Sequence, residues 1–325
     1  MENRRKEFAR NHSLELLLKE VNRDLWLAEK KLVRNCDSDF PLIFIMGPLR
    51  SGSTLFLQWL ASTGVFSYPT NLLSRFYQAP IIGAKIQLLL ADERYNYRDE
   101  LMEFKSTIDF CSENGKTKGA LAPNEFWYFW RRFLPFDELD YLPSDELLQR
   151  VDMATMKAEF VGMMQVFAKP MVLKGMILNY NIDFLDQLFN RAVFIHIKRD
   201  PLANIESALK ARERQFGSIE KWYSFKIPEY ESLIKCDPFE QVAGQIYYIN
   251  RAVEKGLEKV SVHKKMTVQY EDFCENPRLA FEELQVKLHE NGFNINHEYR
   301  FQEKFNVSKR FVDDPRILKA YKKYR

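Results

Sequence analysis

The stretch Pro41-Leu-Ile-Phe-Ile-Met-Gly-Pro-Leu-Arg-Ser-Gly-Ser-Thr-Leu55 joins a short apolar run to a loop bounded by two glycines. The run 42–46 is too short for a core helix and lies between a proline and a glycine, so it predicts a buried strand of a parallel sheet. A helical pattern begins directly after the loop. Because a helix N-terminus presents unpaired amides and partial positive charge, this junction favours an anion.

The loop resembles an ATP-binding phosphate loop but differs from it at one position. Gly47 and Gly52 have the spacing of G-x-x-x-x-G-K-[ST], yet Ser53 stands where that motif has its lysine. The nearest cation is Arg50, inside the loop. We therefore expect a nucleotide phosphate held without the usual Mg²⁺ and γ-phosphate apparatus; a glycine turn of purely steric origin is the alternative. Hydroxyl donors for such a phosphate are Ser51, Ser53 and Thr54.

The composition predicts one large globular domain over residues 1–325, with 46% hydrophobic and 29% charged residues. The formal charge of +3 is too small for a general nucleic-acid binder. The four cysteines form no C-x-x-C pair, and no histidine, cysteine or carboxylate cluster has metal-ligand spacing. No secretory signal or apolar run of membrane-spanning length is present, so we expect a soluble cytoplasmic protein with no membrane span.

Apolar patterns along the rest of the chain predict alternating strands and helices. Residues recurring at steps of three and four between Leu14 and Leu32 are typical of an amphipathic helix, within 1–35, packed on the domain's own surface; a membrane or partner helix is the alternative. The alternation predicts a parallel α/β sheet with right-handed crossovers. Further strands are expected at 171–173, 192–197 and 266–268, and helices at 54–62, about 81–90, 145–168, 182–189, 201–212, 239–257 and 277–289.

A second cluster of polar residues follows the predicted strand 192–197. Arg199 lies at the end of this strand, Pro201 begins the next helix, and Ser207 lies on that helix. Ligands of open α/β sheets lie outside the carboxyl ends of the strands, so Arg199 and Ser207 are expected to meet one anion beside the first loop. Two phosphate sites on one sheet suggest a bisphosphorylated nucleotide. His196, inside the strand, is expected to be a buried structural histidine.

With both clusters in place, the chain resembles sulfotransferases that use 3′-phosphoadenosine-5′-phosphosulfate (PAPS). Members carry a [KR]-[ST]-G-[ST]-[ST] loop for the 5′-phosphosulfate, matched by residues 50–54, and an arginine with a serine eight residues on for the 3′-phosphate, matched by Arg199 and Ser207. Val172-Leu-Lys174 and the segment 268–277 are further likenesses. The resemblance spans about 41–280, and it implies a P-loop-type central parallel sheet flanked by helices, sulfotransferase-like, with helical insertions.

The resemblance also implies the chemistry. Arg50 and the loop amides would stabilise charge developing on the bridging oxygen as the sulfuryl group leaves in line, so positioning and electrostatics carry the reaction and no metal is required. Within the basic C-terminal segment 300–325, Ser308-Lys309-Arg310 resembles a segment that folds over the nucleotide phosphates in relatives, which assigns Lys309 and Arg310 to the nucleotide. A solvated basic face is the alternative.

The general base is harder to identify. Relatives use a histidine or glutamate, but 65–76 contains no carboxylate and 175–181 contains no histidine. Our candidate is Glu125, which follows a proline turn and leads an aromatic run, where partial desolvation would raise its pKa. The alternative is an acid in the first turn of a helix. Lys174 would contact the sulfonate or acceptor, or else be a surface lysine at a strand end.

Acceptor contacts are expected from position alone. Trp127, in the aromatic run 126–130, would stack on an acceptor, although such a run is more often core. Tyr68, Asn71 and Arg75 follow the first helix, where acceptor-facing loops would lie. The resulting hypothesis is transfer of a sulfuryl group from PAPS to a hydroxyl or amine, on a carbohydrate or small metabolite. Alternatives are a P-loop kinase or NTPase, and a nucleotide-binding protein without turnover.

Overall fold

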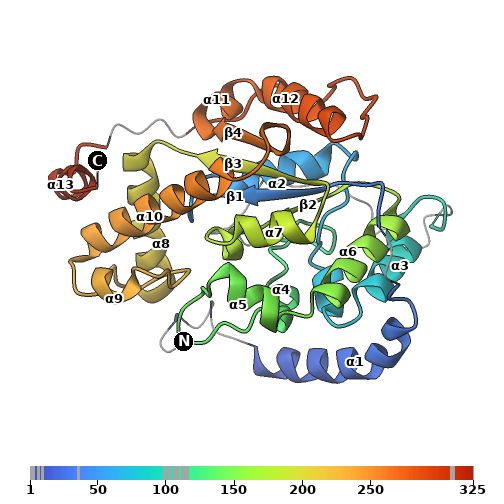
Figure 1. Ribbon diagram of the computed structural model, residues 1–325. Coiled ribbons are helices and arrows are strands. Elements are labelled where there is room, and N and C mark those ends of the chain that lie inside the picture. Colours follow the sequence, from blue (N-terminus) through green and yellow to red (C-terminus); the bar gives the residue numbers. More distant parts are fainter. Residues whose placement is uncertain are drawn as a thin grey trace.

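The computed structural model describes residues 4–5, 8, 11–34, 37–96, 98, 101, 104, 110, 117–307 and 312–324. Four parallel strands form a central sheet in the order β2-β1-β3-β4, flanked by helices (Figure 1). The expected parallel α/β architecture is therefore confirmed. The strands are β1 (Leu42–Met46), β2 (Met171–Lys174), β3 (Ala192–Lys198) and β4 (Lys265–Gln269).

The predicted helices are present with one exception, and the structure adds short helices that were not predicted, at Tyr230–Leu233, Tyr270–Glu275 and Pro315–Lys322. The pattern at 145–168 predicted one helix, but the structure has two, because Val151 is extended and the Asp152 side chain accepts a hydrogen bond from the Thr155 amide as the cap of the second. The α-helices are α1 (His12–Lys30), α2 (Ser53–Ser62), α3 (Pro80–Ala91), α4 (Trp127–Phe133), α5 (Ser144–Arg150), α6 (Met153–Phe167), α7 (Ile182–Leu188), α8 (Pro201–Phe216), α9 (Tyr230–Leu233), α10 (Pro238–Glu258), α11 (Tyr270–Glu275), α12 (Pro277–Glu290) and α13 (Pro315–Lys322); short 3₁₀ turns include η2 (Leu73–Phe76) and η4 (Met176–Leu178).

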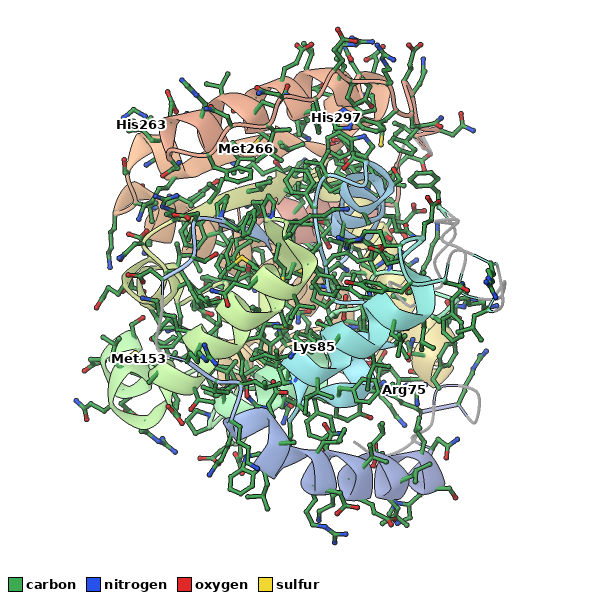
Figure 2. The ribbon with its side chains drawn as sticks, turned by 90° about the vertical axis from the view of Figure 1, so that its right-hand side faces the viewer. Arg75, Lys85, Met153, His263, Met266 and His297 are labelled. Carbon is green, nitrogen blue, oxygen red and sulfur yellow. The ribbon has the colours of Figure 1, made fainter. Side chains whose placement is uncertain are left out.

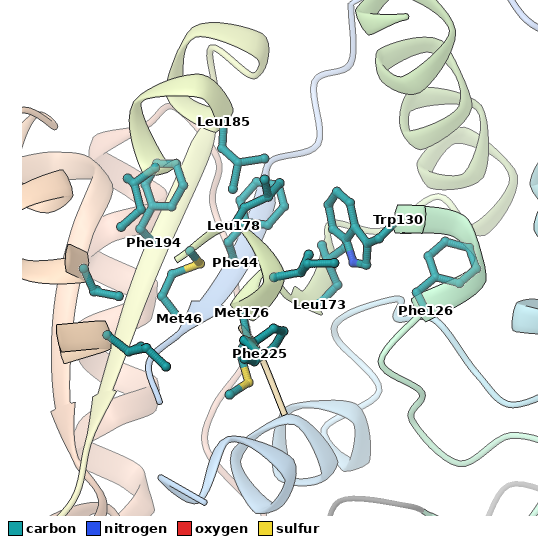
Figure 3. Packing of buried hydrophobic residues seen from close by; sticks show 14 of the residues in the cluster. Phe44, Met46, Phe126, Trp130, Leu173, Met176, Leu178, Leu185, Phe194 and Phe225 are labelled. Atoms are coloured by element: carbon teal, nitrogen blue, oxygen red, sulfur yellow. The ribbon is translucent and has the colours of Figure 1, made fainter. Parts of the chain in front are cut away.

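Strand β1 lies between two hydrophobic cores, one on each face of the sheet. Phe44 and Met46 face a core shared with β3 and the helices α4 to α8, where Figure 3 shows them beside Phe194. Ile43 and Ile45 face the opposite core, built with α2, α11 and α12. Both faces of the strand are buried, which explains why its sequence is continuously apolar. His196, in β3, is also buried as expected, and its Nε2 pairs with the Asn250 side chain.

Helix α1 lies at the margin of the molecule, where it runs beneath α3 and the turn carrying Arg75 (Figures 1 and 2). Two buried polar side chains fasten it. The Asn22 amide donates to the Arg75 carbonyl at 2.7 Å, and the Glu29 carboxylate accepts from the Ile81 and Ile82 amides at the start of α3. The expected docking of this helix on the domain's own surface is confirmed. Within the described part of the chain, no helix combines the length and apolarity needed to cross a membrane.

Candidate active site

The carboxyl ends of the four strands meet at one edge of the sheet, and each is followed or ended by a residue of the same cavity. These residues are Arg50 after β1, Lys174 at the end of β2, Arg199 after β3 and Tyr270 after β4. The cavity has a volume of about 310 Å³. A site built this way depends on the whole sheet rather than on one loop.

The loop after β1 has an unusual backbone. Arg50 adopts a left-handed conformation with φ of 62°, and Gly52, with φ of 95°, precedes α2. A Cβ at Gly52 would lie 2.1 Å from the Tyr270 ring, so glycine is required by both backbone and space. No side chain of the described residues caps α2, and its first turn contains no acid. The amides of that turn therefore remain available to an anion.

Two asparagines hold the backbone of this loop. The Asn179 side chain accepts from the Gly47 amide at 2.9 Å and donates to the Gly47 carbonyl at 2.8 Å. The Asn204 amide donates to the Leu49 carbonyl at 2.8 Å. Both asparagines are buried. Neither role is predictable from the sequence, because an isolated asparagine gives no local signal of a contact made more than a hundred residues away.

The two predicted phosphate motifs lie in contact. Arg50 Nε donates to Ser207 Oγ at 3.2 Å, and the Arg199 guanidinium donates to the Arg50 carbonyl at 2.9 Å while stacking over the Tyr270 ring at 4.9 Å. Burial lowers the pKa of Arg50, and the nearby Arg199 charge lowers it further. Within the described structure, Arg199 Nε and Ser51 Oγ are buried without a partner. Adjacent cations with unused donors are the arrangement that an anion stabilises.

Lys174 connects the residues after β1 to the candidate base. Its side chain is 5% exposed, and Nζ donates to Thr54 Oγ1 at 2.6 Å and to Glu125 Oε1 at 2.8 Å. The alternative of a surface lysine is therefore wrong. The indole N–H of Trp127 donates to the second Glu125 oxygen, Oε2.

The expected rise in the pKa of Glu125 is wrong. Burial acts to raise this pKa, but the Lys174 ammonium, the Trp127 donor and the Arg50 charge outweigh burial and lower the pKa below its usual value. The alternative position in the first turn of a helix is also wrong, because α4 begins at Trp127. Glu125 is a carboxylate held ionised in an ion pair at the cavity wall.

The aromatic run divides between core and cavity. Phe126, Phe129 and Trp130 are buried in the core, as such spacing usually indicates, and Trp130 also reaches the cavity lining. Trp127 lines the cavity. A second aromatic segment that sequence analysis overlooked, residues 223–225, lines it as well.

Other expected residues are not brought to this cavity. The cavity lining does not include Tyr68, Asn71 or Arg75. The chain after α2 turns toward α1 and residues 117–121 instead. There the Tyr68 and Asn71 side chains donate to carbonyls of residues 121 and 119, and the Arg75 carbonyl accepts from α1. Lys309 and Arg310 lie outside the described residues. No group of three or more histidine, cysteine or carboxylate side chains suited to a metal ion occurs in the described ranges.

Comparison with known proteins identifies the family. The model of the sulfotransferase family matches residues 41–290, and the chain belongs to this family. The fold is similar to that of the sulfotransferase STF1 from Mycobacterium tuberculosis, with 12% identity, a TM-score of 0.53 and coverage of 86% of this chain and 74% of that one. The fold is also similar to that of the sulfotransferase STF9 from Mycobacterium avium, with 15% identity, a TM-score of 0.50 and coverage of 83% of this chain and 69% of that one. No curated protein sequence matches the chain.

Proposed function

We propose that this sulfotransferase transfers a sulfuryl group from PAPS to a hydroxyl or amine of a carbohydrate or small metabolite and releases adenosine 3′,5′-bisphosphate. The observation that carries the proposal is the contact between two anion-binding elements at one sheet edge. Arg50 bonds Ser207, and Arg199 bonds the Arg50 carbonyl. A nucleotide with phosphates at two positions needs two such elements side by side.

The residues present fit such a nucleotide. Arg50 and residues 52–54 line the cavity and, with Ser51 and the open amides of α2, would hold the 5′-phosphosulfate. Arg199, which also lines the cavity, would hold the 3′-phosphate together with Ser207, which lies outside the lining but bonds Arg50. The unpaired donors Ser51 Oγ and Arg199 Nε support this assignment, since buried donors normally have partners. Lys309 and Arg310 are proposed to add charge from the C-terminal segment. When bound, PAPS supplies an activated sulfuryl group whose leaving group is a phosphate.

Arg50 and Lys174 are proposed to provide the electrostatic part of the catalysis. Arg50 is fixed by Ser207 and by the loop backbone, so its charge needs no reorganisation to stabilise an anionic leaving oxygen. Lys174 holds a second charge between Thr54 and Glu125. These side chains supply positive charge where sulfuryl transfer generates negative charge, and we propose that the transfer proceeds in line without a metal.

Glu125 is proposed as the general base that accepts the proton of the acceptor. Its ion pair with Lys174 and the bond from Trp127 fix both carboxylate oxygens and keep the group ionised at neutral pH, as a general base requires. Glu125→Gln should retain nucleotide affinity and lose turnover by about a hundredfold or more. Turnover equal to wild type would remove Glu125 from this role.

One set of titrations separates the proposed function from its alternatives. Calorimetry with adenosine 3′,5′-bisphosphate and with ATP–Mg²⁺, followed by a transfer assay with labelled PAPS, should show tight bisphosphate binding and label transfer, both lost in Arg199→Ala. A preference for ATP–Mg²⁺ would support a kinase or NTPase. Bisphosphate binding without transfer over a broad acceptor panel would support a binding protein without turnover.

A further inference from the structure

Residues 223–225, in the connection between α8 and α9, line the cavity but have no part in the proposed donor site or base. Ser224 is held in a left-handed conformation, with φ of 70°. A residue other than glycine in this conformation carries strain that the surrounding structure must offset. Such strain is commonly found at functional sites.

Gln245 is the residue that holds this conformation. It lies on α10 and is fully buried, and its amide donates to the carbonyls on either side of Ser224, at 3.2 Å to Tyr223 and 2.9 Å to Phe225. The Trp222 indole donates to the same Phe225 carbonyl at 3.0 Å. Residues 223–225 are therefore held by Gln245, whose side chain does not itself line the cavity.

The segment is also joined to the helix that carries Trp127. The Phe225 and Trp127 rings pack at 5.5 Å with a tilt of 38°, so they form one continuous apolar surface. Asp140 supports this contact from behind. Its backbone amide and carboxylate bond the Lys226 backbone at 2.8 and 3.0 Å, and the carboxylate also pairs with Arg131 of α4.

Apolar side chains share the cavity lining with this segment, alongside the polar side chains of Arg4 and Gln215. Figure 3 shows Phe225 and Met176 in the same cluster, and Ile177 and Trp127 line the cavity with them. Tyr223 lines the same cavity as Arg50 and Glu125, and burial raises the pKa of its hydroxyl. A sugar carries several hydroxyls that each need a partner when buried, whereas a flat hydroxy compound needs one, at the base.

We propose that residues 223–225, held by Gln245, form the acceptor wall and select a flat, mainly apolar hydroxy compound over a sugar. This inference rests on the proposed function and narrows its acceptor class. Gln245 acts as a positioning residue, because it touches the wall and not the acceptor. Phe225 and Trp127 supply the surface on which the acceptor ring lies.

The test compares two probes and two matched glutamines. Binding of 2-naphthol and of N-acetylglucosamine is measured by equilibrium dialysis, and label transfer from PAPS to each is measured separately. Gln285 on α12 provides the control, because its amide also donates to two backbone carbonyls, of Ile295 and His297, outside the cavity lining. We expect Gln245→Leu to weaken 2-naphthol binding about fivefold and Phe225→Ala roughly tenfold, with Gln285→Leu unchanged.

Further readouts distinguish a positioning role from a general loss of stability. Gln245→Leu should raise the KM for 2-naphthol and leave bisphosphate affinity intact, a selective effect that a general loss of stability would not produce. Preference for N-acetylglucosamine, or equal 2-naphthol binding in wild type and Gln245→Leu, would overturn the acceptor wall while bisphosphate binding still supported the donor. Wall-dependent 2-naphthol binding without bisphosphate binding would retain the wall and reject PAPS.

Discussion

Tyr270 explains why the phosphate loop tolerates only glycine before α2. The Tyr270 ring packs against Gly52, and the Arg199 guanidinium stacks on a face of the same ring. The loop arginine is left-handed, and strain of this kind costs on the order of 1–3 kcal/mol, which the side-chain bonds to the loop carbonyls offset. The proposed donor site is thus a stack of backbone, ring and guanidinium, in which each layer sets the position of the next.

Gly52→Ala tests this stack against a matched glycine. Gly64 also has positive φ, at 67°, but nothing lies within 4 Å of a Cβ added there. Gly64→Ala should therefore lower the free energy of unfolding by about 1 kcal/mol, the cost of the left-handed backbone alone. Gly52→Ala adds a clash with Tyr270 and should cost about 3 kcal/mol or more and weaken bisphosphate binding at least about tenfold. Denaturant unfolding and calorimetry measure both; equal effects of the two substitutions would contradict the stack.

Lys174→Met should change how activity depends on pH. In the wild type, burial acts to raise the pKa of Glu125, but Lys174 and the other partners lower it below the usual value, so Glu125 stays ionised at neutral pH. The fall of activity on the acid side of the pH profile should therefore lie below the usual range of a glutamate. Without the ammonium, burial is opposed less, the pKa of Glu125 moves up, and the loss of activity begins at higher pH. The pH profile of kcat/KM measures this shift.

Lys169→Met is the control for that profile, because Lys169 bonds the Gly64 carbonyl outside the cavity lining. Its acid limb should match that of the wild type. An unmoved limb in Lys174→Met would show that Glu125 is not the group whose ionisation controls turnover.

At the scale of elements, strands and helix starts were predictable because their signals are local. The run 42–46 is apolar throughout because both faces of β1 are buried, and Pro201 lies at the first position of α8 as expected. The helix at 145–168 was wrongly joined, because its apolar spacing continues across the cap at Asp152. The acceptor wall was overlooked because Gln245 meets residues 223–225 only through packing, which no local pattern encodes.

The attachment of α1 gives a prediction at this scale. Glu29 accepts hydrogen bonds from the Ile81 and Ile82 amides. Both amides lie in the first turn of α3, where the helix itself provides no carbonyl acceptor. Glu29→Ala leaves both amides without this acceptor and should lower the free energy of unfolding by about 2 kcal/mol. It should also expose the connection between α1 and β1 to limited proteolysis. Glu20→Ala, on the exposed face of α1, should do neither; similar cleavage of both variants would mean that Glu29 does not fasten the helix.

At the scale of the whole molecule, the proposed nucleotide site joins both cores. The loop after β1, the turn after β3 and Tyr270 after β4 belong to elements separated by up to 220 residues in sequence and are held together mainly by the sheet. The order of the two phosphate motifs was predictable from the sequence. Their direct bond was not, because it depends on β1 and β3 being neighbours in register.

Because a ligand at this edge binds only the assembled sheet, it should stabilise the entire fold. Adenosine 3′,5′-bisphosphate at one hundred times its Kd should raise the free energy of unfolding by about 2.7 kcal/mol, with or without a chelator of divalent cations. Arg199→Ala should lose most of this gain at the same ligand concentration.

The matched control is Arg278→Ala, since Arg278 stacks over Tyr299 at 5.1 Å much as Arg199 stacks over Tyr270 at 4.9 Å, but outside the cavity lining. Arg278→Ala should lose some stability and keep the full ligand-induced gain, because, of these two arginines, Arg199 alone combines stacking with a hydrogen bond to the loop after β1. Denaturant unfolding with and without ligand measures both quantities, and an undiminished gain in Arg199→Ala would place the nucleotide elsewhere on the molecule.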